Sequence, residues 1–335
     1  MIRQWALAFG GIGLLGAAVS IAVVDRQLAP LVAEPASSQV FVVEHGASLA
    51  QVARQLEKAQ LIRNALATEW LGRYRGDAGR LRSGEYELAP HWTPGAILTH
   101  LRSGPVYTYA VVLPEGINAT GVAERLEAAG VVDAEAFLEV VRNPKTTEAL
   151  GLEGDSLEGY LFPETYRMPR NLRADRVARI LTDQFAETWK ELEPVARARN
   201  MSMREAVTLA SIIEKETATP EERPLIASVF HNRLRRGMRL ETDPTVIYGI
   251  PEFDGNLRRH HLQDGSNPYN TYKHAGLPPG PIANPGAAAL RAAVEPAKSD
   301  YLFFVSRNDG SHAFSRTYAE HEKMVDRYQR RRRTR

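Results

Sequence analysis

The chain has 335 residues, which is enough for two or three domains with sizeable cores. Charged residues make up 24% of it, the formal net charge is +2, and the hydrophobic fraction of 44% is ordinary for a soluble body. Cysteine is absent, and this excludes disulfides and thiolate metal sites.

The first predicted element is an uncharged apolar run of 20 residues from Trp5 to Val24. A helix of that length, at about 1.5 Å per residue, spans a bilayer core of about 30 Å. Arg3 precedes the run, whereas Asp25 and Arg26 nearly cancel after it, which favours the N-terminus inside. A cleaved signal peptide is the alternative, but its apolar region is usually about 7–15 residues long. We therefore predict a single-pass protein of the inner membrane, held by the lipid bilayer, with residues 1–4 cytoplasmic, an uncleaved anchor over 5–24 and a linker over 25–39.

An internal repeat follows, because residues 46–59 resemble residues 116–129. Each copy fits a strand, a glycine turn, a polar N-cap (Ser48 or Asn118) and an amphipathic helix. Together with a strand over 84–88 and a helix near 94–102, the first copy resembles a LysM module, a kind of module that binds N-acetylglucosamine-containing chains in other proteins. We predict a LysM-like α+β subdomain over 40–105. A structural subdomain that only positions the catalytic part is an equal alternative.

A helix is predicted in the middle of the chain, starting after Ser202. Ser202 and Glu205 form a capping box, so the helix should begin near Met203 and end near Thr217. One stripe of this helix ends in Glu214, whereas Glu216 points about 200° away from Glu214. The stripe comprises Val207, Ala210, Ser211 and Glu214.

Two further helices are expected around it. Residues 172–199 have a helical pattern with a break at Pro194, and a second capping box at Thr219 and Glu222 should open a helix that runs to Arg236.

Glu214 is the candidate acid. A carboxyl group against apolar surface keeps its proton near neutral pH, because desolvation disfavours the charged form. A sugar-cleaving enzyme needs such a proton for the leaving oxygen. The alternative is a surface glutamate in the charged triplet Glu214, Lys215 and Glu216.

Four blocks of the chain resemble, in the same order, the endolytic murein transglycosylase family, also called YceG-like. These blocks are residues 156–166, 210–217, 233–249 and 269–285, and the likeness covers residues 40–320. Four long blocks in order are more specific than a short motif. The resemblance implies a mixed α+β catalytic domain over 106–322, in which Glu214, and not Glu216, is the catalytic acid and base.

The resemblance also implies the reaction, that of a lyase. Protonated Glu214 would donate to the oxygen between N-acetylmuramic acid and N-acetylglucosamine, inside peptidoglycan glycan strands. The C6 hydroxyl of the muramic sugar would then attack C1, with Glu214 as base, to leave a 1,6-anhydro end. No water is consumed, and no metal or cofactor is required. Acting on nascent strands, such an enzyme terminates their elongation.

Six polar residues in the matched blocks are candidates to orient sugar hydroxyls and N-acetyl groups. For all six, structuring the surrounding loops is at least an equal alternative. The six are Asn232, Asp243, Thr245, Tyr248, Asn270 and Tyr272.

Two other functions stay open. A water-using muramidase would need a second carboxylate, for which Glu164, Glu241 and Asp243 are available. A non-catalytic cell-wall-binding division or envelope scaffold would use the repeated modules. Candidate protein partners are peptidoglycan synthases or other envelope proteins.

The basic tail, residues 323–335, is expected to be a solvated, disordered end. Nucleic acid is not expected as a partner, because an extracytoplasmic tail would meet anionic lipids or cell-wall polymers. The histidines at 260, 261, 274 and 312 show no metal-binding spacing, so no metal site is expected.

Overall fold

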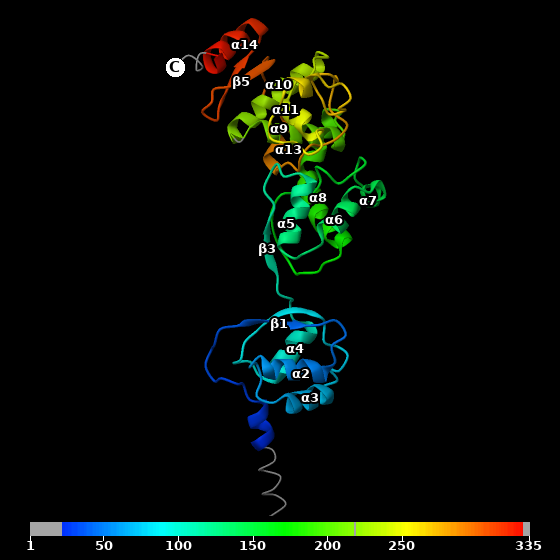
Figure 1. The fold of residues 1–335 in the computed structure, drawn as a ribbon, viewed down its shortest axis with the longest axis vertical. Helices are drawn as coiled ribbons and strands as arrows, with labels where there is room; N and C mark the ends of the chain where they lie inside the picture. Colours follow the sequence, from blue (N-terminus) through cyan, green and yellow to red (C-terminus); the bar gives the residue numbers. More distant parts are fainter. Residues whose placement is uncertain (1–21, 218, 331–335) are drawn as a thin grey trace, which may run out of the picture. The chain divides into compact units, whose positions relative to one another are not determined.

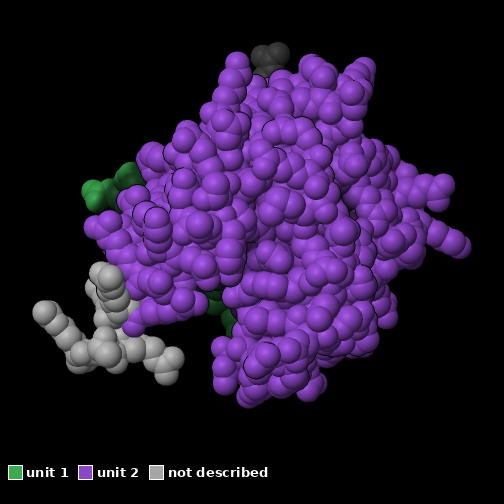
Figure 2. Space-filling model, turned by 90° about the horizontal axis from the view of Figure 1, so that it is seen from above, with its two compact units in different colours: residues 1–109, 167–170 green, residues 110–166, 171–335 purple. Residues whose placement is uncertain are grey.

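The computed structural model describes residues 22–217 and 219–330 and has the α+β class expected from the sequence (Figure 1). The chain divides into two compact units, which Figure 2 draws in different colours. Unit 1 comprises Met1–Tyr109 and Arg167–Arg170, and unit 2 comprises Ala110–Tyr166 and Asn171–Arg335. Sequence analysis placed a boundary between residues 105 and 106, whereas the first division between the units falls after Tyr109.

Unit 1 is a small α+β body around one two-stranded sheet. Its elements are β1 (Gln39–Val43), α2 (Leu49–Lys58), α3 (Ala65–Tyr74), β2 (Gly84–Leu88) and α4 (Pro94–Ser103). The strands β1 and β2 pair antiparallel, with Phe41 opposite Tyr86. Ser48 caps α2 with a full capping box, as its polar side chain before an apolar periodic segment predicts. Tyr86 and Leu56 are fully buried in the core between the sheet and the helices.

Unit 2 is mainly helical. Its helices before residue 200 are α5 (Ala119–Ala128), α6 (Ala134–Val141), α7 (Pro144–Ala149) and α8 (Ala174–Ala198). They are followed by α9 (Met203–Glu216), η1 (Pro220–Glu222), α10 (Arg223–Arg235), α11 (Asp243–Tyr248), α12 (Arg259–Gln263) and α13 (Ala287–Val294). The chain ends in β5 (Phe303–Ser306), β6 (His312–Ser315), α14 (Tyr318–Val325) and η2 (Asp326–Arg330). The strands β3 (Tyr109–Val112) and β4 (Thr165–Met168) pair with each other, and the chain passes between the units within β3, within β4 and again after Arg170.

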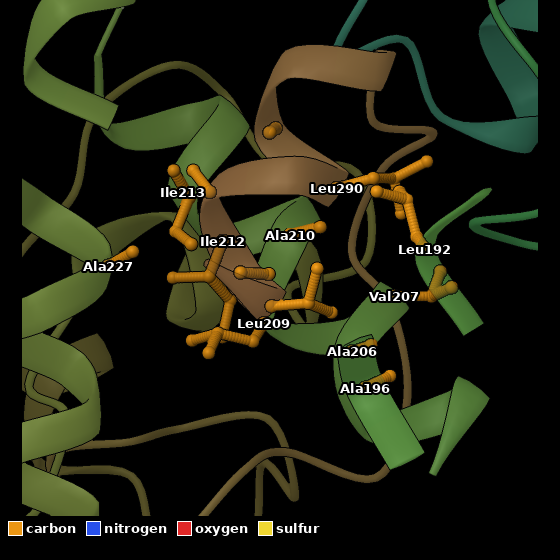
Figure 3. Close-up of a cluster of buried hydrophobic side chains, with 14 of the residues drawn as sticks. Leu192, Ala196, Ala206, Val207, Leu209, Ala210, Ile212, Ile213, Ala227 and Leu290 are labelled. Carbon is orange, nitrogen blue, oxygen red and sulfur yellow. The ribbon is translucent and has the colours of Figure 1, made fainter. Parts of the chain in front are cut away.

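Helix α9 forms the centre of the unit 2 core, and it packs against α13, α10 and α8. It begins after Ser202 with the predicted capping box and ends at Glu216. Its residues 206–213 are all buried, so the helix is enclosed on every side rather than along one stripe. Figure 3 shows Leu209 and Ile212 of this helix in the same apolar cluster as Leu290 of α13. A helix held in this way presents its last turn in a fixed position.

The second predicted capping box is wrong. The hydroxyl of Thr219 donates to the carbonyl of Gly310 at 2.9 Å and makes no cap. Glu222 instead accepts the backbone N–H of His312 at 2.8 Å and pairs with its Nδ1 at 2.6 Å. Contacts with the β5–β6 hairpin therefore override the local pattern, and one 3₁₀ turn precedes α10.

The predicted helix break at Pro194 is also wrong, because α8 continues through this residue to Ala198. Leu192 and Ala196 flank the proline and are both buried, so core packing offsets the lost backbone hydrogen bond. At the other end of the chain, residues 323–330 are helical rather than disordered, and Gln329 donates to the carbonyl of Ser306. Residues 331–335 of the basic tail lie outside the described residues.

Within residues 22–217 and 219–330, no helix is long and apolar enough to cross a membrane. The anchor predicted from Trp5 to Val24 lies almost wholly outside the described residues.

Candidate active site

Glu214 occupies the last turn of α9, and its side chain is only 5% exposed. Its Oε1 accepts a hydrogen bond from Nη2 of Arg223 at 2.8 Å, and its Oε2 accepts the backbone N–H of Gly286 at 3.0 Å. A carboxylate at a helix C-terminus faces the negative end of the helix dipole, and the guanidinium compensates for this. The surroundings therefore differ from the apolar ones expected, because α10 starts at Arg223 and brings a cation to the end of α9.

Arg223 also joins Glu214 to a second carboxyl group. Its Nη2 lies 3.3 Å from Oε2 of Glu115, a side chain that is 48% exposed. Burial raises the pKa of Glu115, the negative charge of Glu214 raises it further, and Arg223 opposes both. The absence of a side chain at Gly286 makes room for this cluster. A Cβ at this position would lie 1.8 Å from Oε1 of Glu115. Two carboxyl groups therefore share one buried guanidinium.

A cavity of about 540 Å³ opens beside this cluster. Gly116, with a φ of +74°, lines the cavity and also lies next to Glu214, because a Cβ there would be 3.4 Å from Cγ of Glu214. Lys215 lines the cavity and donates from Nζ to the carbonyl of Gly116 at 3.2 Å. The lining residues are Gly116, Ile117, Asn118, Lys215, Pro244, Ile247, Tyr248 and Ile282.

A buried carboxyl group, Glu158, lies behind the cavity wall. It accepts the N–H of Ala119, at the start of α5, with both oxygens at 3.0 and 3.1 Å. The Tyr248 hydroxyl and the Asn284 amide also donate to it, at 3.2 and 3.0 Å. Burial raises the pKa of Glu158 to about 7, although these hydrogen bonds lower it. Glu158 thus ties the cavity residue Tyr248 to the core.

Asn284 fixes the same region from another loop. Its Oδ1 accepts the N–H groups of Gly159 and Leu161, at 2.9 and 3.0 Å, and its Nδ2 also donates to the carbonyl of Ile117. Since Asn284 is fully buried, each of these polar atoms depends on it for a partner. The sequence did not predict four residues of this region as functional: Asn284, Glu158, Arg223 and Glu115. Glu158 and Asn284 do lie inside the blocks that carry the family resemblance.

Of the six predicted substrate-binding residues, Tyr248 lines the cavity next to Glu214. Asp243 accepts a hydrogen bond from the Tyr272 hydroxyl at 2.7 Å, which joins the start of α11 to the following loop. Thr245 is buried and bonded to Thr242 and Thr271. These three contacts hold α11 on its loop.

Asn270 and Asn232 lie in similarly structural positions. Asn270 is fully buried, and its Nδ2 donates to carbonyl groups of residues 261, 262 and 264. Asn232 of α10 donates to the carbonyls of Ser299 and Tyr301, in the segment before β5. Neither residue lines the cavity beside Glu214. Loop structuring is thus the role that these contacts support, and sugar contact by these residues stays a prediction.

Glu216 faces away from Glu214, as the helical spacing predicts. Its Oε1 accepts a hydrogen bond from the Thr242 hydroxyl. Burial raises its pKa to about 6, the negative Asp243 raises it too, and the Thr242 hydrogen bond, His312 and Arg233 lower it. Glu216 is therefore a buried support of the α11 loop.

The three acids named as a second carboxylate have other partners in the described residues. Glu241 pairs with Arg233 at 3.2 Å, Glu164 accepts the N–H of Thr165, and Asp243 binds Tyr272. In that same part of the chain, no group of three or more histidine and acidic side chains is arranged to hold a metal ion.

The α+β fold and the carboxyl–guanidinium–carboxyl cluster beside an open cavity define a protein equipped for acid–base chemistry on a polar substrate. The sequence matches the YceG-like family over residues 41–327, and the chain belongs to this family.

The relatives carry a consistent description. The chain is 32% identical to the "Endolytic murein transglycosylase" of Bacillus subtilis (strain 168), over 85% of this chain and 83% of that protein. It is 28% identical to the protein of the same name from Streptococcus pneumoniae serotype 2 (strain D39 / NCTC 7466), over 87% of this chain and 59% of that protein. The crystal structure of a putative YceG-like protein from Listeria monocytogenes matches with a TM-score of 0.61 and 31% identity, covering 86% of this chain and 99% of that one.

Proposed function

We propose that this chain is an endolytic peptidoglycan lytic transglycosylase, a lyase that cuts the bond between N-acetylmuramic acid and N-acetylglucosamine within glycan strands. Membership of the YceG-like family and the names of the relatives support this reaction. The observation that carries the assignment of the catalytic group is the position of Glu214: its carboxyl group is buried, and its neighbours Lys215 and Gly116 line the cavity.

The cluster suggests how Glu214 serves in both steps. As an acid, Glu214 gives its proton to the bridging oxygen while the bond from that oxygen to C1 of the muramic sugar breaks. As a base, it then takes the proton of the C6 hydroxyl while the oxygen of that hydroxyl bonds to C1. The proton lost in the first step returns in the second, so the reaction consumes no water.

Arg223 and Gly286 stabilise the ionised form of Glu214 that exists between the two steps, because both donate to its oxygens. Glu115 offers Arg223 a second acceptor.

Replacement of Glu214 by Gln tests this assignment. Gln keeps the size and accepts the same N–H groups, but it has no proton to transfer, so turnover should fall about 10²–10⁴-fold while the protein stays folded. Glu216→Gln is the matched control on the same helix turn and should keep most of the activity. Equal losses in the two variants, measured by release of products from purified glycan strands, would falsify the role of Glu214.

A water-using muramidase is the second candidate, and Glu115 favours it. This carboxyl group shares Arg223 with Glu214 and is partly exposed, as a residue that activates water must be. The two reactions differ in the origin of the oxygen at the new muramic end, which isotope labelling reports. A non-catalytic scaffold predicts no product at all from either wild type or variants.

We further propose that unit 1 is a LysM-like module that holds the glycan strand. Its order of strand, two helices and strand supports this, with β1 and β2 antiparallel. A cavity of about 730 Å³ lies between the turn before α2 and the loop before β2, lined among others by His45, Ser48 and Arg82. Binding of N-acetylglucosamine oligomers that is lost in Ser48→Trp, with unit 1 still folded, would support the proposal.

The localisation is proposed from the sequence of residues 5–24. An uncleaved apolar run anchors the chain in the inner membrane, with both units on the outer face, where nascent strands are made. Synthases and other envelope proteins are the partners that such a position offers.

A further inference from the structure

Helix α3 of unit 1 has its large apolar side chains on the outside. Leu66, Trp70 and Tyr74 are spaced four residues apart and are 63%, 66% and 92% exposed. The spacing i, i+4, i+8 places them along one face of the helix. This face is one continuous apolar stripe, which we call the α3 stripe.

The inner face of the same helix carries small residues instead. Ala65, Thr68 and Gly72 are buried, and a Cβ on Gly72 would lie 2.8 Å from a methyl group of Leu49. Helix α3 thus packs closely on α2 through small side chains and exposes its large ones. Folding of unit 1 alone gives no reason for Trp70 and Tyr74 to be apolar, so the stripe indicates a partner outside the chain.

The path of the chain before β1 indicates which partner lies nearby. Arg63, two residues before α3 begins, donates from Nε to the carbonyl of Pro30 at 3.0 Å and from Nη2 to the carbonyl of Leu31 at 2.7 Å. The N–H of Leu31 in turn donates to the carbonyl of Pro90 at 3.0 Å. The segment that leaves the apolar run is therefore fastened to unit 1 at the base of α3.

The tether between that fastening and the apolar run is short. Five residues lie between Val24 and Pro30, and a fully extended chain from one to the other reaches about 20 Å. Residues 22–28 are helical, and a helix rises only about 1.5 Å per residue, so the actual reach is shorter. If residues 5–24 lie in a bilayer, the N-terminal end of α3 must stay close to its surface.

We propose that the α3 stripe inserts into the head-group region of the bilayer that holds the anchor. Trp and Tyr are the side chains enriched at this depth, because each combines an apolar ring with a polar N–H or O–H group. Arg63 and Arg73 flank the stripe and are exposed, so their positive charges lie where phosphate head groups would be. Arg63 also holds the carbonyls of Pro30 and Leu31, and Arg73 pairs with Glu69 at 2.7 Å. The proposal rests on the proposed anchor, and it makes unit 1 a membrane-surface module as well as a glycan-binding one.

The absence of cysteine makes the test direct, because one introduced cysteine is the sole labelling site. The full-length protein carrying Tyr74→Cys is labelled with a nitroxide and reconstituted in vesicles of phosphatidylethanolamine and phosphatidylglycerol. Val42→Cys on β1, a site 52% exposed in the same unit, is the matched control. Collision rates with oxygen, which concentrates in lipid, and with a water-soluble nickel complex are measured for both.

The expected result is a several-fold higher oxygen-to-nickel collision ratio at position 74 than at position 42. Adding Leu66→Ser and Trp70→Ser should lower the ratio at position 74 to the control value while the protein still floats with the vesicles. A vesicle-bound protein with equal ratios at the two positions overturns the α3 proposal and leaves the anchor standing. A protein that does not float with vesicles overturns both. A lipid partner is also refuted if collisions of nickel with position 74 are reduced without vesicles, either when soluble glycan strands are added or when the protein concentration is raised.

Discussion

The buried carboxyl group of Glu158 makes the folding stability of unit 2 depend on pH in a way that one substitution should remove. Its pKa is raised from 4.5 to about 7, so the folded state holds the proton more tightly than the unfolded state. The proton on Glu158 therefore stabilises the folded state fully below about pH 4.5, and this stabilisation is lost as the pH rises towards 7. With about 1.4 kcal/mol per pH unit, charging this group costs the folded state about 3 kcal/mol, as an upper value.

Glu158→Gln replaces the titrating group with a neutral one of the same size. Between pH 5 and pH 8, the stability of the variant relative to wild type should rise by about 2–3 kcal/mol, following from the same shift. At about 2–4 °C per kcal/mol for a unit of this size, the difference in Tm between variant and wild type should change by about 5–10 °C. Thermal unfolding followed by circular dichroism at the two pH values measures this change. Glu164→Gln, an exposed acid in the same segment, is the control.

A Tm difference between Glu158→Gln and wild type that is the same at pH 5 and pH 8 would refute the reasoning. It would mean that the pKa of Glu158 in the folded state is not raised into this pH range by its burial among Ala119, Tyr248 and Asn284.

Two further substitutions probe how the site is held. Gly286 has an ordinary backbone conformation, but Gly286→Ala places a methyl group on the Glu115 carboxyl, so activity should fall by up to about 10²-fold with little change in Tm. The control Ala288→Gly, at an exposed position in the first turn of α13, should show no such loss of activity. Asn284→Ala should lower stability by about 2–5 kcal/mol in thermal unfolding, because it leaves the N–H groups of two buried residues without partners, whereas Asn256→Ala in an exposed loop should change it by less than about 0.5 kcal/mol.

The limits of α9 could be predicted from the sequence because they depend on local signals. The Ser202 capping box needs only residues three positions apart, and it appears as predicted. The opposite directions of Glu214 and Glu216 follow from the helical period alone. The assignment of Glu214 rather than Glu216 to the chemistry came from the family resemblance, and the family is confirmed.

The long-range contacts that build the site could not be predicted in the same way. Glu115 and Arg223 are 108 residues apart in the chain, and Glu158 and Asn284 are 126 residues apart. No periodic pattern connects such pairs, so only the folded chain shows that they meet. The helix break predicted at Pro194 failed for a related reason, because the buried neighbours of this proline on α8 pack into a core that local propensity does not report.

The central claim, intramolecular attack after proton donation by Glu214, is tested most directly by cleaving purified glycan strands in ¹⁸O water. Intramolecular attack predicts products lighter by one water than hydrolytic ones, no label in the new muramic end, and turnover about 10²–10⁴-fold slower in Glu214→Gln. One ¹⁸O per cut in the muramic end, seen by mass spectrometry, would contradict intramolecular attack and would support the muramidase reaction instead.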